Sequence, residues 1–170
     1  AISTMPADVA KLGATSDNIF LTFEESGAVG RLRIRVFDGT TFVADLDKSL
    51  AFYRDVIGLQ PNAPPRPFDG NAAIMKLGNT PGAQSRFVAL SVPGSPIGVE
   101  LIEYKDIDRT PARPGFQDPG AANLILRVRD LDTVVERVKK SGGKILTVSG
   151  TPASIGNGGK VMFIQDLDGF

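Results

Sequence analysis

The stretch that decides the fold is VADLDKSLAFYRDVIGL, residues 43–59, because its pattern returns at residues 128–143 as VRDLDTVVERVKKSGG. The two copies align at a fixed offset of 85 residues, and each has Val-x-Asp-Leu-Asp, a helix-length segment and a closing glycine. A repeat of this length indicates two copies of one supersecondary unit. The sequence therefore predicts a fold assembled from two related halves.

Each copy has the pattern of a capped helix. Asp45 and Asp130 stand where a helix N-cap belongs, since a carboxylate there accepts from the free N–H groups of the first turn. Apolar residues recur at helical spacing behind each cap, and a glycine ends each stretch. We expect helices at residues 46–57 and 131–141.

Apolar runs separated by proline and glycine follow each helix and are typical of strands. We expect strands at residues 72–78, 85–94 and 98–104 after the first helix, and at 144–150 and 160–166 after the second. With a strand before each helix, the first unit is β-α-β-β-β and the second is β-α-β-β.

The chain before the first copy has two strand-like segments. Three arginines alternate with apolar residues in RLRIRV, residues 31–36. The arginines can form an anion-binding patch, but the preferred interpretation is that they form the solvated face of a strand. Residues 17–25, DNIFLTFEE, can form an added strand of no assigned function. The predicted organisation is an extension at 1–30, a first unit at 31–110, a linker at 111–122, and a second unit at 123–170 that lacks its last strand.

Composition narrows the function classes. Acidic and basic residues balance at 19 each, so we expect neither nucleic acid nor a membrane surface as a partner. The chain contains no cysteine and no histidine, and no apolar run approaches the roughly 20 residues that span a bilayer. Because it begins at Ala1 rather than Met, we expect a processed or incompletely represented chain. A soluble protein, cytoplasmic or exported after processing, fits these features.

Several motifs together resemble the vicinal oxygen chelate superfamily, the glyoxalase, bleomycin-resistance and extradiol-dioxygenase group. They are Asp-Leu-Asp-x-Ser-Leu-x-Phe-Tyr-x-Asp-x-x-Gly-Leu from residue 45, Val-Glu-Leu-Ile-Glu-Tyr from residue 99, the second Asp-Leu-Asp helix, and Gln-Asp-Leu-Asp-Gly-Phe from residue 165. The resemblance covers residues 36–170. It implies an α+β fold in which two βαβββ units form a half-open, barrel-like mixed sheet around a cavity.

The resemblance also implies a divalent metal held by four side chains, two from each unit. The matching positions are Asp38, Glu100 and Asn123, and the fourth lies beyond Phe170. Because the chain has no histidine, a two-histidine iron site cannot form, which argues against extradiol dioxygenase chemistry. We expect either no cofactor or a divalent cation, for which Mg²⁺, Mn²⁺ or Ca²⁺ suits oxygen ligands better than zinc or iron. Alternatively, these polar residues only line a wet cavity.

Strand alternation extends the candidate site, because residues two apart share one face of a strand. The predicted small-molecule lining is Thr40, Phe42, Ile102, Asn123, Ile125 and Arg127. An apolar lining with a few polar groups suits a small ligand. Arg127 can bind a carboxylate or phosphate, or it can pair with Asp38 or Glu100, and both interpretations stay open.

Two further features are interpreted as structural. SIGNGGKV, residues 154–161, resembles a phosphate loop but has Ser154 in place of the first glycine, so a hairpin loop is predicted. Tyr53 fits the apolar stripe of the first helix and is predicted to pack in the core.

Three functions are compatible with these residues. The first is a glyoxalase-type metal-dependent lyase or isomerase with Glu100 as the catalytic base. The second is a metal-free or weakly metal-binding protein that holds an aromatic or amphipathic small molecule. The third is a structural or assembly role with a decayed site. The missing histidines favour the second and third. We also expect a homo-oligomer, a dimer in the first instance, if the native chain has the closing strand of the family.

Overall fold

The computed structural model describes residues 22–24, 33–35, 40–95, 98–111, 114–119, 121, 123–156 and 158–170. The chain divides into two compact units, one made of Ala1–Val36 with Pro114–Asn123, the other of Phe37–Arg113 with Leu124–Phe170. In the compact unit that contains Ala1–Val36, strands β1 (Thr22–Glu24) and β2 (Arg33–Arg35) pair antiparallel. Both strands lie inside the two segments predicted as strands. No helix of the described residues is long and apolar enough to cross a membrane.

The first repeat helix begins at its predicted cap. α1 (Leu46–Ala51) follows Asp45, whose carboxylate accepts from the Lys48 N–H at 3.2 Å. The helix continues as a π-helical segment, η2 (Phe52–Ile57), and ends at Gly58 with a φ of 94°. Glycine suits this left-handed conformation because it has no Cβ. The predicted helix is confirmed over its full length, and only the wider turns of its second half were not anticipated.

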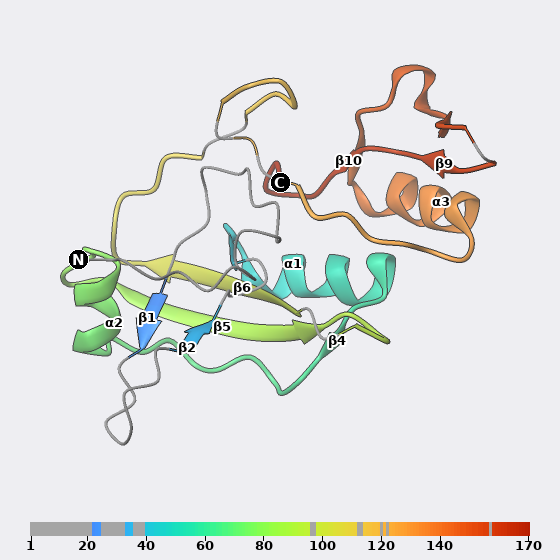
Figure 1. Cartoon of the computed structure of the whole chain (residues 1–170). Helices are drawn as coiled ribbons and strands as arrows, with labels where there is room; N and C mark the ends of the chain where they lie inside the picture. The colour runs from blue at the N-terminus through green and yellow to red at the C-terminus, as the bar shows by residue number, and fades with distance from the viewer. Residues whose placement is uncertain are drawn as a thin grey trace, which may run out of the picture. The chain divides into compact units, whose positions relative to one another are not determined.

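Four strands form the sheet of the first copy in the order β3-β6-β5-β4. They are β3 (Thr40–Phe42), β4 (Gln60–Pro61), β5 (Gln84–Ser91) and β6 (Gly98–Lys105). β3 runs parallel to β6, and the other neighbours are antiparallel. α1 contacts β5 and β6 and lies along one face of the sheet (Figure 1). The predicted βαβββ order is confirmed.

One predicted strand is wrong. Residues 72–78 were expected to be a strand, but α2 (Ala72–Leu77) is a helix. The side chain of Asn71 caps it by accepting from two backbone N–H groups, at 2.9 Å and 3.3 Å. Its residues include good helix formers, and a short apolar run does not by itself distinguish strand from helix. The strand that completes the unit is β4, which the sequence reading missed.

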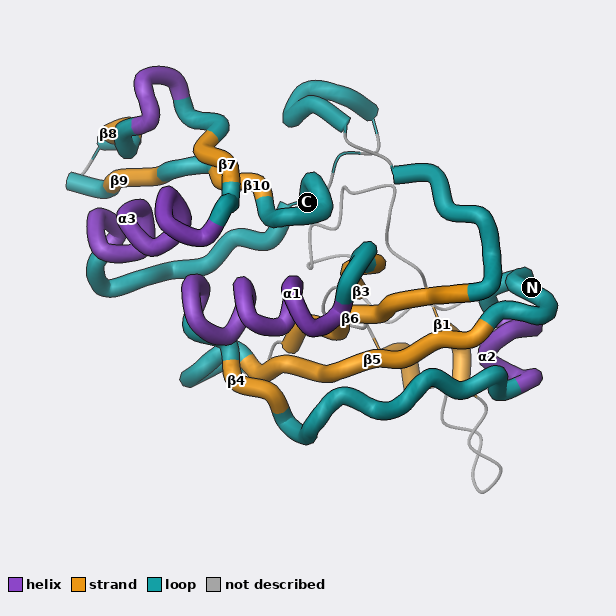
Figure 2. The backbone as a smooth tube through the Cα atoms, turned by 180° about the vertical axis from the view of Figure 1, so that it is seen from behind, coloured by secondary structure: helices purple, strands orange, loops and turns teal. Residues whose placement is uncertain are grey.

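The second copy has its helix where predicted and shorter strands than predicted. α3 (Leu131–Ser141) follows the cap Asp130. The strands are two antiparallel pairs, β7 (Lys144–Ile145) with β10 (Ile164–Gln165), and β8 (Ala153–Ser154) with β9 (Lys160–Val161). The strand expected at 144–150 gives way to a 3-10 turn, η3 (Val148–Gly150), where Ser149 has a φ of 62°. Residues 123–128, the expected first strand, have no regular structure and are drawn as loop in Figure 2.

The glycine-rich stretch forms the predicted hairpin loop. It joins β8 to β9, and within it the Ile155 N–H donates to the carbonyl of Gly159 at 3.0 Å. A strand precedes this loop and another follows it, whereas a phosphate loop leads into a helix. The hairpin interpretation is therefore confirmed.

The two repeat helices meet in one core. Leu46, Leu90, Leu101 and Val138 are fully buried, and α3 contacts η2. Gly143 permits this packing, because a Cβ there would lie 2.8 Å from the Phe52 ring and 3.0 Å from a Val138 methyl group. Gly142 ends the helix at a φ of 85°, and the next glycine, Gly143, is required by side-chain packing.

The C-terminal turn is tied to the first repeat helix by two aspartates. Asp166 accepts from the Tyr53 hydroxyl at 2.8 Å, and its other oxygen accepts from the N–H groups of residues 168–170 at 2.8–2.9 Å. Asp168 accepts from the Ala44 N–H and the Ser49 hydroxyl, both at 2.9 Å. Tyr53 is buried, as predicted, and it also supplies a hydrogen bond that the sequence did not indicate.

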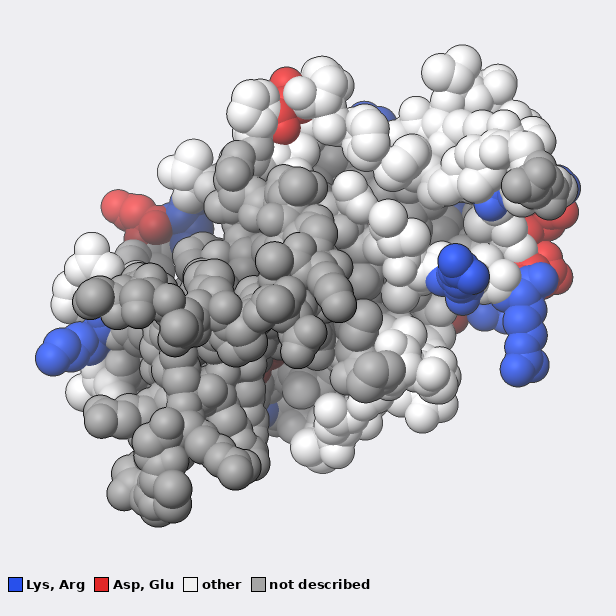
Figure 3. Space-filling view, in the orientation of Figure 1, with Lys and Arg blue, Asp and Glu red and all other residues white. Residues whose placement is uncertain are grey.

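Charged side chains are interspersed on the surface. In the view of Figure 3, blue and red side chains of the described residues lie close to one another, without a broad area of one sign. This distribution agrees with the equal numbers of acidic and basic residues, 19 each, in the whole sequence.

Candidate functional site

The long strands of the first sheet alternate between a face covered by α1 and a face turned away from it. Val88, Leu90, Val99 and Leu101 are buried in the core beside α1. Because successive side chains on a strand point to opposite sides, the intervening residues lie on the other face. We call this surface the distal face, and it comprises Thr40, Phe42, Phe87, Ala89, Glu100, Ile102 and Tyr104.

Four residues of the predicted site meet on the distal face. Thr40 is the register partner of Glu100, and Phe42 is the partner of Ile102, in the parallel pair β3–β6. Phe42 is exposed over 55% of its surface, whereas the other three are half-buried. Strand parity placed them on common faces in the sequence, and the register of β3 against β6 puts them side by side.

The distal face also has aromatic residues that the sequence analysis missed. Phe87 is the register partner of Ile102, and Tyr104 lies 6.0 Å from Phe42 between ring centroids. The guanidinium carbon of Arg66 lies 5.0 Å from the centroid of the Phe87 ring. Alternation along β5 could have assigned Phe87 to one face with Ala89. The approach of Arg66 had no signal in the sequence.

Glu100 is the acidic side chain of the distal face, and it has no hydrogen-bond or ion-pair partner among the described residues. Its carboxyl group is half-buried, and this burial raises the pKa of Glu100 above its ordinary value. Desolvation raises a carboxyl pKa because it disfavours the charged form. With respect to the described residues, Glu100 therefore has an unused hydrogen-bonding capacity and an incomplete solvent shell.

Glu103, on the same strand, has the opposite environment. It faces α1, accepts from the Leu46 N–H at 2.9 Å, and pairs with Arg86 at 2.7 Å. Arg86 also contacts Asp47, at 2.9 Å. All partners of Glu103 lie within the protein, so its role is to fix the start of α1 on the sheet. The two glutamates of Glu-Leu-Ile-Glu-Tyr thus differ in environment.

The remaining predicted residues are Asp38, Asn123, Ile125 and Arg127. Asn123 belongs to the other compact unit, and Asp38 lies outside the described residues. Ile125 is 83% exposed, and Arg127 is exposed without an ion pair among the described residues. The alternating Leu124 and Leu126 pack against the core. With no strand at 123–128, the opposite side chains project into solvent.

The metal implied by the resemblance requires more ligands than this face supplies. Among the described residues, no group of three or more acidic, histidine or cysteine side chains can hold a metal ion. At the predicted ligand position the oxygen donors are the Glu100 carboxylate and the neighbouring Thr40 hydroxyl. Mg²⁺ and Ca²⁺ take about six or more oxygen ligands, so the described residues of this face do not by themselves complete a site for such an ion.

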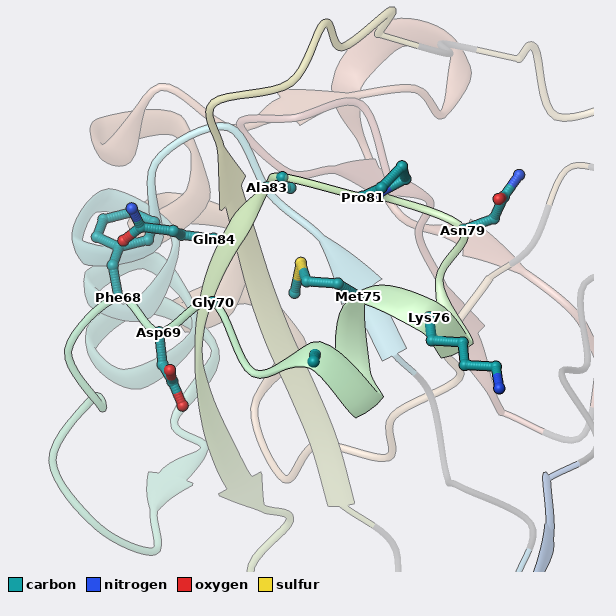
Figure 4. A pocket seen from close by; sticks show the side chains of 11 residues that line it. Phe68, Asp69, Gly70, Met75, Lys76, Asn79, Pro81, Ala83 and Gln84 are labelled. Atoms are coloured by element: carbon teal, nitrogen blue, oxygen red, sulfur yellow. The ribbon is translucent and has the colours of Figure 1, made fainter.

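Two cavities lie away from the predicted residues. One, of about 850 Å³, opens between α2 and the start of β5, where Met75 and Ala83 form a buried apolar floor. Figure 4 shows the long side chains of Asp69, Lys76 and Asn79 directed outward from it. The other, of about 370 Å³, lies at the start of α3 beside Lys160. Neither is lined by a residue of the distal face.

The chain belongs to the glyoxalase/bleomycin resistance protein/dioxygenase superfamily, whose family model matches residues 36–170. The matched range is the one over which the sequence motifs resembled this group. It includes the distal face and both repeat helices. No curated protein matches the chain.

Three solved structures are similar to the chain. A glyoxalase family protein from Bacillus cereus has a TM-score of 0.68 at 16% identity, over 81% of this chain and 90% of that chain. A glyoxalase family protein from Enterococcus faecalis has a TM-score of 0.48 at 16% identity, over 77% and 87%. A mutant of the fosfomycin resistance protein FosX from Listeria monocytogenes, complexed with Mn(II) and dihydroxypropylphosphonic acid, has a TM-score of 0.47 at 16% identity, over 76% of this chain and 82% of that chain. The Bacillus protein establishes the shared α+β, glyoxalase-like fold.

Proposed function

We propose that this protein binds an aromatic or amphipathic small molecule on the distal face, without a metal or with a weakly held divalent cation. The observation that carries the proposal is Glu100, a half-buried carboxylate with no partner among the described residues. Around it lie Phe42, Phe87, Ile102 and Tyr104. Apolar surface with a few polar groups is the usual composition of a small-molecule site.

A purely structural role does not account for Glu100. Partial burial of a carboxylate without a hydrogen bond or counter-charge lowers the stability of the fold. Glu103 shows that the same strand can hold a glutamate with its hydrogen-bonding capacity satisfied. Residues that break the rules of local stability concentrate at functional sites, and a ligand donor would supply what Glu100 lacks.

The test compares Glu100→Gln with Glu103→Gln, two equal changes three residues apart on one strand. A library of aromatic and amphipathic molecules is screened by ligand-observed NMR, and stability is measured by urea unfolding. We expect Glu100→Gln to weaken binding of the hits and leave the fold intact. We expect Glu103→Gln to retain binding but lose about 1–2 kcal/mol of stability, because the Arg86 charge then pairs with Asp47 and no longer with Glu103.

The two variants also define failure. Hits that bind equally well to the wild type and to Glu100→Gln would show that Glu100 is not the anchor. Binding lost only in Glu103→Gln, at temperatures where that variant is folded, would transfer the site to the α1 side of the sheet. Either result contradicts the proposal.

A second candidate is a glyoxalase-type lyase or isomerase with Glu100 as the base. The raised pKa of Glu100 favours it, because a general base works best when its pKa approaches the operating pH. This function requires a metal ion that completes its coordination outside the described residues. Electron paramagnetic resonance with Mn²⁺ distinguishes the candidates. Stoichiometric binding that Glu100→Gln abolishes supports the enzyme, and free Mn²⁺ at millimolar protein supports the binding protein.

A further inference from the structure

An apolar row crosses the distal face and ends at an arginine. Phe42, Ile102 and Phe87 are successive register partners on β3, β6 and β5. The next segment across is the chain after β4, where the Arg66 N–H donates to the Phe87 carbonyl at 3.2 Å. The Arg66 guanidinium lies over the Phe87 ring, with its carbon 5.0 Å from the centroid. Since that ring belongs to the distal face, the guanidinium shares the face with Glu100.

The guanidinium N–H groups of Arg66 have no hydrogen-bond acceptor within the described residues. Its side chain is exposed and has no ion pair or hydrogen bond within the described part of the chain. Arg86, which faces α1, is by contrast held by Glu103 and Asp47. A guanidinium stacked on a ring keeps its N–H edge free for a carboxylate, which it matches with two parallel hydrogen bonds. Stacking also restricts the side chain beforehand, which reduces the entropy lost on binding.

Opposite charges therefore flank the aromatic row without neutralising each other. Glu100 is on β6, and Arg66 belongs to the segment beyond β5. Two spacings of roughly 4.8 Å across the sheet and two residues along the strand, roughly 7 Å, separate the two backbone positions by about 12 Å. A ligand that spans this distance over the rings can meet the cation at one end and the carboxylate at the other.

We propose that the ligand is a planar aromatic acid with a hydrogen-bond donor at its far end, and that Arg66 binds its carboxylate. This assignment rests on the proposed function, because it specifies the ligand of the same face. The ring lies on Phe42, Ile102 and Phe87, and the donor reaches Glu100. The reverse orientation is disfavoured, since it places the ligand carboxylate beside Glu100 and leaves both charges without partners.

The test uses three probes that differ by one group. Para-coumarate has a carboxylate and a hydroxyl at opposite ends of a planar skeleton, cinnamate lacks the hydroxyl, and para-coumaramide replaces the carboxylate by a neutral amide. Affinities are measured by calorimetry for the wild type, Arg66→Gln, Arg66→Lys and Glu100→Gln. The matched control is Arg54→Gln, which removes an exposed arginine of η2 that pairs with Asp55.

We expect Arg66→Gln to lower the affinity for para-coumarate and cinnamate about tenfold or more, because a charged hydrogen-bonded contact is lost. The same change should alter para-coumaramide less than about twofold, since a neutral amide gains little from a cation. Arg66→Lys should recover part of the loss, because it restores the charge but not the planar fork. Glu100→Gln should weaken para-coumarate and para-coumaramide but not cinnamate, and Arg54→Gln should alter none of the three.

The outcomes separate this inference from the proposed function. If the phenolic probes bind and lose affinity in Glu100→Gln, while Arg66→Gln affects no probe, the assignment of the ligand as an aromatic acid is overturned, but the proposed ligand site stands. If para-coumaramide binds as tightly as para-coumarate, the assignment of the ligand as an acid is overturned in the same way. If no probe binds the folded wild type at millimolar concentration, this inference is overturned. If the wider library also gives no Glu100-dependent hit, the proposed function is overturned with it.

Discussion

Removing the Tyr53 hydroxyl should measure how strongly the C-terminal turn is tied to the first repeat helix. In Tyr53→Phe the ring still fills the core, but Asp166 loses the donor on one of its two carboxylate oxygens. The other oxygen keeps three backbone N–H groups at 2.8–2.9 Å. The perturbation therefore isolates one hydrogen bond between segments more than a hundred residues apart in sequence.

The magnitude follows from the charge and the burial of Asp166, which is 8% exposed. A hydrogen bond to a charged group contributes about 1.5–3 kcal/mol, and the lower part of this range applies because Asp166 remains partly satisfied. We expect a loss of about 1.5–2 kcal/mol. With a urea slope near 2 kcal/mol per molar, the unfolding midpoint should fall by about 1 M at unchanged slope.

The effect should also depend on pH in a defined direction. Burial, reinforced by the negative charge of Asp166, raises the pKa of Tyr53 well above its ordinary value of 10.0. The hydroxyl stabilisation is then fully present below the pKa of the unfolded chain and is lost above it. In that range only the unfolded tyrosine ionises, so stability decreases with rising pH. The difference between wild type and Tyr53→Phe should therefore narrow above about pH 10.

The chain supplies a matched control, because Tyr104 is its only other tyrosine. The Tyr104 hydroxyl has no hydrogen-bond partner among the described residues, so Tyr104→Phe should shift the midpoint by less than about 0.3 M. Equal midpoints for Tyr53→Phe and wild type, or equal losses in both tyrosine variants, would refute the reasoning. Either result would mean that the hydroxyl of Tyr53 does not stabilise the turn.

Three further results are expected. Glu100→Gln should raise stability by on the order of 0.5 kcal/mol at neutral pH. The pKa of Glu100 in the folded protein is raised above its ordinary value of 4.5, so its carboxylate destabilises the fold as the pH rises through the folded pKa. The stability gained by Glu100→Gln should therefore vanish when urea unfolding is measured near about pH 4. Gly143→Ala should cost about 1–3 kcal/mol by overpacking against Phe52. Gly70→Ala should cost little stability, because its Cβ would have no neighbour nearer than 3.7 Å. Equal melting temperatures for Gly143→Ala and Gly70→Ala would contradict this expectation. Light scattering of the native chain should give a dimer, and a monomer at high micromolar concentration would count against it.

The sequence by itself determined the repeat helices and the faces of the long strands. Helix caps, apolar stripes and closing glycines depend on residues a few positions apart, so Asp45 and Asp130 could be recognised without any tertiary contact. Strand parity likewise separated Glu100 from its buried neighbours Val99 and Leu101. The same short-range logic was insufficient for residues 72–77, where a brief apolar run is compatible with either element.

The tertiary structure alone decided how three identical tripeptides differ. Asp-Leu-Asp begins at residues 45, 130 and 166. The leading aspartates of the first two copies, Asp45 and Asp130, cap helices. At residue 166 it forms a turn whose carboxylates reach Tyr53 and Ser49. It also decided that Arg66 approaches Phe87 and that residues 123–128 form no strand. These outcomes depend on register and on contacts between distant segments, and no local preference encodes which distant atoms will meet.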